Sequence, residues 1–377
     1  MRFVRFIPKL SSWVVLLALH APGLARAESA TQPVRKKAPR TAAAPSAAQP
    51  TSTLRQRAQS GLYAPGTPYY PERYWALEKK LGVRAEIVSG FVDFEYVFGE
   101  PRDLALSLKG KRKLLYSWEP HCVGEGTPEQ SCTDFRAVID GKLDEYFERI
   151  ALSMQSYPGE IYVRPWAELN APWSPYRPGS SSSRAGTRDE FIAAWRHLVK
   201  FFRTRGINNL RFVFSPDANE DAETVPVASL FPGTEFVDVL GIDGYNWGDG
   251  GRDGNTSWRE FDGVFADMYR RLTALHPNAP VWICEFGLKE PKRDDGSAES
   301  PAPTDPKHDK AQWLERALNS SEFPHLAALV FYSSRPASGY QRDFNVDSSA
   351  GSLRATRAWF KYRQGVKRGK RPGSSSR

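Results

Sequence analysis

Strand-like and helix-like segments alternate along the chain, and this order constrains the fold more than any other feature. Short apolar runs, expected to be strands, lie at 61–64, 85–92, 113–118, 160–166, 210–214, 236–242, 281–286 and 327–332. Helical patterns lie at 71–81, 103–108, 140–155, 188–205, 221–230, 258–275, 307–319 and 353–362. Strict alternation predicts a parallel sheet, and eight units of this length predict an α/β fold closed as a single (β/α)₈ TIM barrel. An open doubly wound sheet is the alternative, but no glycine fingerprint follows an early strand.

The first 27 residues have the pattern of a secretory signal peptide. A basic start precedes the apolar segment 13–19, which is too short to span a bilayer, and Ala25-Arg-Ala27 fits a cleavage site. An N-terminal membrane anchor is the alternative. We therefore expect a secreted or periplasmic protein that does not span the membrane.

Two further segments are too polar and too basic to form a core. Residues 28–57 are rich in Ala, Pro and basic residues and are expected to be a disordered linker. Residues 366–377 are expected to be a disordered basic tail. These boundaries predict one folded domain at 58–365.

The positive charge of the chain is concentrated at its two ends. Residues 1–57 carry a net charge of +9 and residues 367–377 carry +5, so residues 58–366 carry −5 of the total of +9. A mildly acidic domain argues against nucleic acid as a partner. Weak contact of the basic tails with acidic envelope polymers is one interpretation, and a solvated tail is the other.

The three cysteines and six histidines do not form a metal-ligand pattern. Cys122 and Cys132 bracket a polar loop, and an oxidising compartment favours a disulfide between them. Cys284 lies within an apolar segment and is expected to be buried. Because no His/Cys pair has ligand spacing, we expect no metal site.

Two predicted strands end in glutamates, Glu168 after 160–166 and Glu285 within 281–286. Two carboxylates at the carboxyl-terminal end of a barrel suit glycoside hydrolysis, in which one carboxyl gives a proton and the other stays ionised. Glu168 has apolar neighbours such as Trp173 and suits the acid/base role. Arg164 and Tyr245 could keep Glu285 ionised. The alternative for each glutamate is a structural salt bridge.

These segments also carry a resemblance to a known family. RPWAELNAPW at 164–173 resembles the acid/base motif of glycoside hydrolase family 26, to which many secreted β-mannanases belong. WEPH at 118–121, VDVLGIDGY at 237–245 and WICEFG at 282–287 resemble other strand ends of that family, in the same order.

The resemblance implies a retaining endo-β-glycoside hydrolase that needs no cofactor and acts on a β-linked polysaccharide, first of all β-1,4-mannan. It makes Glu168 the general acid/base and Glu285 the nucleophile, with Tyr245 hydrogen-bonded to the nucleophile. The residues expected to contact substrate are Trp118, His121, Arg164, Asn170, Trp173, Asp243, Tyr245, Trp247 and Arg335. His121 has a second interpretation, which is that it holds the loop bracketed by the two cysteines.

Three positions depart from the mannanase pattern. Ala167 stands where these enzymes usually have His, Ala171 where they have Gly, and Ser334 where they tend to have Trp. Since these positions surround the reacting sugar, mixed-linkage glucan, xylan and bacterial exopolysaccharide remain alternative substrates. Two other readings are a glycan-binding barrel without catalysis and an envelope-associated protein held by its tails.

Overall fold

The computed structural model describes residues 53–94, 96–119, 134–179, 185–220, 225–248, 258–290, 308–334 and 343–367. The expected signal peptide, most of the expected linker and nearly all of the basic tail lie outside these residues. The linker boundary was wrong at its end, because Leu54–Arg57 form helix α1 with Leu54 fully buried. The Leu54 N–H and the Arg57 guanidinium both donate to carbonyls in the segment after α8, and these contacts order α1.

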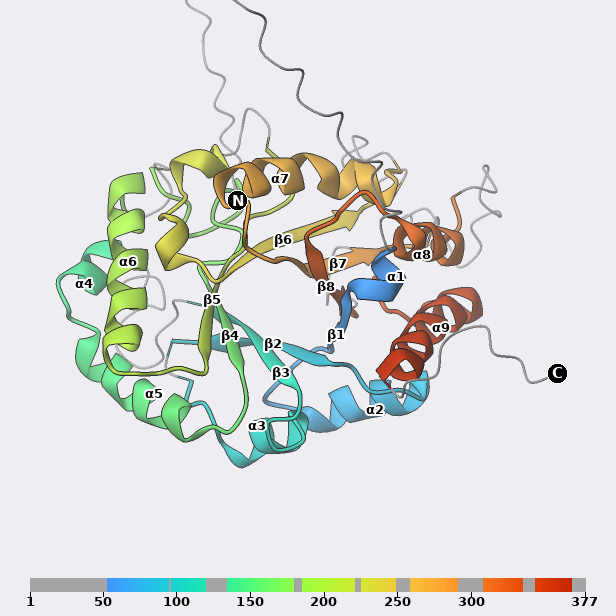
Figure 1. Cartoon of the computed structure of the whole chain (residues 1–377), viewed down its shortest axis with the longest axis horizontal. Helices are drawn as coiled ribbons and strands as arrows, with labels where there is room; N and C mark the ends of the chain where they lie inside the picture. The colour runs from blue at the N-terminus through green and yellow to red at the C-terminus, as the bar shows by residue number, and fades with distance from the viewer. Residues whose placement is uncertain are drawn as a thin grey trace, which may run out of the picture. The chain divides into compact units, whose positions relative to one another are not determined.

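Eight parallel strands close into a barrel in sequence order, which confirms the predicted fold (Figure 1). The strands are β1 Gln59–Tyr63, β2 Ile87–Asp93, β3 Lys113–Glu119, β4 Ile161–Pro165, β5 Leu210–Phe214, β6 Val239–Asn246, β7 Val281–Leu288 and β8 Leu326–Tyr332. Strand β1 pairs with both β2 and β8, so the sheet has no free edge.

Helices surround this barrel. They are α2 Pro71–Leu81, α3 Pro101–Leu106, α4 Phe135–Ile139, α5 Asp144–Ser156, α6 Arg188–Thr204, α7 Phe261–Leu275, α8 Lys310–Asn319 and α9 Ala350–Lys367. The sequence did not predict α4, whose N-terminus is capped by the Asp134 carboxylate. The last helix also extends two residues into the predicted basic tail.

The helix predicted at 221–230 is wrong within the described residues. That part of the β5–β6 connection contains two 3₁₀ turns, η1 Val227–Ser229 and η2 Thr234–Phe236. Pro226 explains the difference, because proline has no N–H to donate and its ring clashes with the preceding helical turn.

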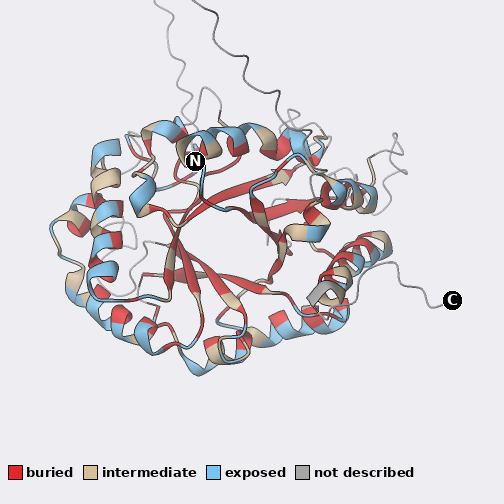
Figure 2. Ribbon diagram, viewed as in Figure 1, coloured by how far each residue is buried: buried red, intermediate tan, exposed pale blue. Residues whose placement is uncertain are grey.

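The strands are buried over most of their length, whereas the helices have many exposed residues (Figure 2). The strand side chains belong to two cores, one on each face of the sheet. Facing the barrel axis is a small inner core formed by Ile87, Leu115, Tyr162, Val213, Val239, Trp282, Cys284, Ala328 and Val330. A larger outer core lies between the strands and the helices. Cys284 is buried in the inner core, as its position in an apolar segment predicted. The inward-facing positions beyond the inner core, toward the carboxyl ends of the strands, form the site described next.

Candidate active site

The carboxyl ends of the strands bring polar and aromatic side chains together at one end of the barrel. This ring consists of Tyr63 on β1, Phe91 on β2, Ser117 on β3, Arg164 on β4, Ser215 after β5, Asp243 and Tyr245 on β6, Glu285 on β7 and Tyr332 on β8. In parallel barrels, this end of the strands carries the active site.

Glu285 faces into the ring because β6 and β7 shift register beside it. Ile242 pairs with Ile283, whereas the next residue, Asp243, pairs with Glu285. Cys284 already faces the barrel interior, so strict alternation would turn Glu285 outward toward the helices. The irregularity reverses this direction and places the carboxylate next to Arg164.

Arg164 lies at the centre of the ring and is completely buried. Its guanidinium donates to Asp243 Oδ1 at 2.6 Å and to Glu285 Oε1 at 2.5 Å, and it also bonds the Ser117 hydroxyl. The other oxygen of Asp243 accepts a hydrogen bond of 3.1 Å from Ser215. One buried cation therefore binds two carboxylates, and this contact fixes the position of the Glu285 side chain.

The second oxygen of Glu285 is held by a phenol. Tyr245 Oη donates to Glu285 Oε2 at 2.6 Å. Both oxygens of Glu285 thus accept hydrogen bonds while its side chain stays largely buried. Two donors from different strands, the Arg164 guanidinium on β4 and the Tyr245 phenol on β6, therefore fix the orientation of this carboxyl group.

Glu168 lies in a strained turn that follows β4. The φ angles of Trp166 and Glu168 are +50° and +56°, a left-handed conformation that non-glycine residues rarely adopt. The Glu168 N–H donates to the Ser215 carbonyl at 2.8 Å, which anchors the turn to the end of β5. Trp173 Nε1 donates to Glu168 Oε2 at 2.9 Å, so the indole holds the carboxyl group from the solvent side.

The surroundings of Glu168 favour its protonated form. Burial, followed by the negative charges of Glu285 and Asp217, raises the pKa of Glu168 to about 8, although the Trp173 hydrogen bond lowers it. Burial raises the pKa of Tyr245 and Tyr332 most, the charge of Glu285 raises it next, and the charge of Glu168 makes a smaller contribution in the same direction. The two glutamates therefore belong to one electrostatic site, in which Glu168 has a raised pKa and Glu285 is bound by a guanidinium and a phenol.

Trp118 does not belong to this site, which corrects its predicted contact with substrate. Its ring is fully buried in the outer core. The ring centroid lies 4.9 Å from that of Phe94 and 5.9 Å from those of Phe147 and Phe202. Ser117, its neighbour on β3, is the residue that faces the ring.

Three other residues predicted to contact sugar lie behind the site. Arg164, Asp243 and Asn170 are completely buried and expose no surface to a ligand. The Asn170 amide donates to two backbone carbonyls, those of Asp217 and Asn219, and accepts from the Asp217 N–H. Asn170 thus ties the Glu168 turn to the segment after β5, and all three residues position the groups that line the site.

Aromatic side chains form the exposed part of the site. Trp173 is 59% exposed beside Glu168. Trp247, half-buried, lies with its ring centroid 5.3 Å from that of Tyr245 and 5.1 Å from that of Phe344. Phe344 and Tyr332 also contact Tyr245, and neither was predicted from the sequence, although Tyr332 ends a predicted strand. His121, Cys122, Cys132 and Arg335 lie outside the described residues.

Two general features of the described residues bear on cofactors and membranes. No group of three or more His, Cys, Asp or Glu side chains there is arranged to hold a metal ion. Among the same residues, no helix has the length and apolar character needed to cross a bilayer.

Comparison with known proteins gives the family. The family model for glycosyl hydrolase family 26 matches residues 130–281, which include the Glu168 turn. The chain belongs to this family. Endoglucanase H of Acetivibrio thermocellus is 31% identical to this family 26 chain over 280 residues, which are 73% of the chain and 27% of the endoglucanase. A mannan endo-1,4-beta-mannosidase of Bacillus subtilis strain 168 is 30% identical over 160 residues, 40% of this chain and 38% of that protein.

A solved structure shows the same fold. The family 26 β-mannanase BoMan26A of Bacteroides ovatus superimposes with a TM-score of 0.52 at 17% sequence identity, covering 81% of this chain and 90% of that chain. The family 26 chain described here spans less than two fifths of the length of the two sequence relatives named above.

Proposed function

We propose that this protein is a retaining endo-β-glycoside hydrolase with Glu168 as general acid/base and Glu285 as nucleophile. The observation that carries this proposal is the opposite environment of the two carboxyl groups in one site. Burial raises the pKa of Glu168 to about 8, while Arg164 and Tyr245 hold Glu285 by both oxygens. Glycosidases need one carboxyl of each kind on either side of the scissile bond.

The first step of the proposed reaction breaks the bond between the anomeric carbon and the leaving oxygen. Glu168 gives its proton to that oxygen while a Glu285 oxygen forms a bond to the anomeric carbon. In the second step, water attacks the glycosyl–Glu285 ester, and the ionised Glu168 takes a proton from this water. Glu285 leaves as a carboxylate, and Arg164 and Tyr245 are in place to stabilise it.

We propose a β-1,4-linked mannan as the first candidate substrate. The named mannosidase of Bacillus subtilis and the family motif around Glu168 support it. A β-glucan is the second candidate, because the 280-residue match is to a protein named as an endoglucanase. Ala167, where mannanases of the family usually have His, fits a sugar-binding region that differs from theirs.

The test is reducing-sugar release from mannan, glucomannan, mixed-linkage glucan, xylan and bacterial exopolysaccharides, with the Glu285→Ala variant as the blank. Release from mannan or glucomannan supports the first candidate, and release from mixed-linkage glucan alone supports the second. Equal release by the enzyme and the Glu285→Ala variant would refute the assigned mechanism. Binding of a polysaccharide without release would favour a non-catalytic barrel.

We also propose that the protein is exported, on the pattern of its first 27 residues. N-terminal sequencing of the protein expressed in a bacterial host would test this proposal. A mature chain that begins at Glu28 supports export, and retention of the intact N-terminus in the cytoplasm contradicts it.

A further inference from the structure

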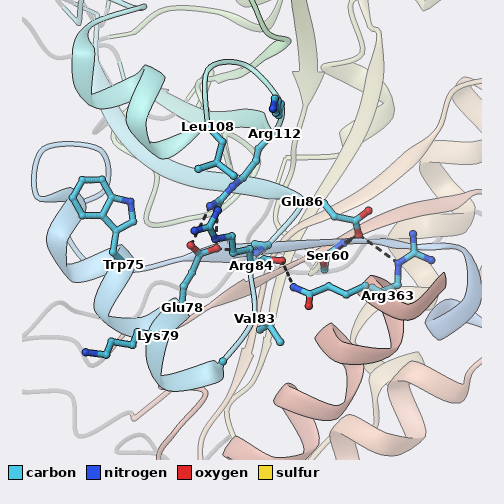
Figure 3. A pocket seen from close by; sticks show the side chains of 14 residues that line it. Ser60, Trp75, Glu78, Lys79, Val83, Arg84, Glu86, Leu108, Arg112 and Arg363 are labelled. Carbon is cyan, nitrogen blue, oxygen red and sulfur yellow. Dashed lines mark hydrogen bonds and ion pairs between the residues drawn. The ribbon is translucent and has the colours of Figure 1, made fainter. Parts of the chain in front are cut away.

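A cavity of about 880 Å³ lies at the amino-terminal end of the barrel strands, the end opposite Glu168 and Glu285. Ser60 at the start of β1, Glu86 just before β2 and Arg112 just before β3 form its floor (Figure 3). The end of α2 and Arg363 on α9 form its walls. Its volume lies within the range of pockets that hold small ligands.

Two ion pairs account for part of the charge in this cavity. Arg112 donates to both oxygens of Glu78, at 2.7 and 3.2 Å, and Arg363 lies 3.4 Å from Glu86. All four of these side chains are largely buried, and the pairs join α2 and α9 to the barrel. This end of a (β/α)₈ barrel commonly carries residues that stabilise the fold.

Three other cations in the cavity have no such structural role. Lys79, Arg84 and Lys111 are exposed at its rim, and none of them forms a salt bridge with a carboxylate of the described residues. The lining as a whole has five cationic side chains and two carboxylates, an excess of three positive charges. Residues 58–366 are acidic overall, so the basic lining is a local feature.

Three further features bear on the chemistry of the ligand. Trp75 is 40% exposed one turn before Lys79 on α2, so it offers a flat apolar surface beside the cations (Figure 3). The buried Nε of Arg112 has no hydrogen-bond partner. The α2 helix presents its C-terminus here, where the helix dipole is negative and opposes a concentrated dianion such as phosphate.

We propose that this cavity is a second carbohydrate site, which binds an acidic oligosaccharide carrying uronic acid carboxylates. A sugar ring would stack on Trp75, and its carboxylates would pair with Arg84, Lys111 and Lys79. Carboxylates spaced along a sugar chain match cations spaced around a rim better than one compact dianion does. The site goes beyond the proposed hydrolysis of neutral glycans, and its test reads binding alone, so either proposal can fail without the other.

The experiment is isothermal titration calorimetry of the full-length mature chain carrying Glu285→Ala, which removes the proposed nucleophile. The probes are an oligogalacturonate, a neutral mannooligosaccharide and inorganic phosphate. The Arg84→Glu/Lys111→Glu variant reverses two exposed rim charges, and Trp75→Ala removes the stacking surface. Lys361→Glu is the matched control, because Lys361 is an exposed cation of α9 that does not line the cavity.

We expect the oligogalacturonate to bind, and the double charge reversal to weaken its affinity by about tenfold or more, with a strong dependence on salt. Trp75→Ala weakens it as well, Lys361→Glu changes it by less than about twofold, and binding of the mannooligosaccharide is the same in all rim variants. Circular dichroism checks that each variant is folded. No binding of the oligogalacturonate, undiminished binding after the double reversal, or displacement by equimolar phosphate would overturn the proposal.

Discussion

Replacing Arg164 by Met removes a positive charge that lies within hydrogen-bonding distance of two buried carboxylates, Asp243 and Glu285. Arg164 and Asp243 are completely buried, and Glu285 is only 6% exposed. Breaking a buried ion pair by removing one partner costs about 3–5 kcal/mol, because the remaining charge has neither a partner nor water. Since two carboxylates lose their partner here, we expect Arg164→Met to lower the free energy of unfolding at neutral pH by the upper part of that range.

Urea denaturation, followed by tryptophan fluorescence, measures this loss. The Arg205→Met variant is the control, because Arg205 pairs with Glu148 at the surface, where such pairs contribute about 0–1 kcal/mol. Asp243→Asn in the Arg164→Met background removes one of the two uncompensated charges and should restore part of the stability. A loss below about 1 kcal/mol for Arg164→Met would show that the fold does not depend on compensating these two carboxylates.

The pH dependence of this loss gives an independent check of its cause. Burial raises the pKa of Asp243 well above its usual value, and Arg164 lowers it, so removing Arg164 should raise the pKa of Asp243 further. A carboxyl group whose pKa is higher in the folded state than in the unfolded state destabilises the fold at pH values above its unfolded pKa. At lower pH the group is protonated in both states and the destabilisation disappears. The deficit of Arg164→Met should therefore shrink as the pH falls, and a deficit independent of pH would indicate a packing defect instead.

Three further predictions concern catalysis. In its proposed role Glu168 acts in the protonated form, and burial raises its pKa to about 8, so kcat/KM should fall as the pH rises through about 8; a fall centred near pH 5 would contradict the proposed role. Trp173→Phe removes an N–H that favours the ionised Glu168, so that fall should move to higher pH, as measured by the same profile. Tyr245→Phe removes a hydrogen bond to a charged group, worth about 1.5–3 kcal/mol, and should lower kcat/KM by about 10- to 100-fold without unfolding the protein.

Much of the fold could be predicted from the sequence because the local signals agree with one another. The helix at 71–81 has the predicted bounds, since Pro71 suits the first helical turn and Gly82 ends the helix at a φ of +67°. The signals failed where packing decides the structure. Helix α1, four residues long, depends on burying Leu54, and no periodic pattern can show so short a helix.

The candidate site could be predicted in part. Glu168 and Glu285 follow from strand ends, but Trp118 was assigned to the wrong face of its strand. It has the same parity on β3 as Leu114 and Tyr116, which lie in the outer core, so alternation alone would have placed it among the helices. Glu285 is the opposite case, because alternation would turn it outward, and only the register shift between β6 and β7 brings it into the site.

A comparison of Glu168→Ala and Glu285→Ala tests the proposed roles of the two glutamates, with an aryl glycoside of the sugar identified by the polysaccharide panel as substrate. A good leaving group needs no proton, so Glu168→Ala should still form the glycosyl–enzyme and release the phenol in a burst, and azide should accelerate turnover. Glu285→Ala should release no phenol under either condition. A burst from Glu285→Ala, or a Glu168→Ala variant that azide does not restore, would contradict the assigned roles.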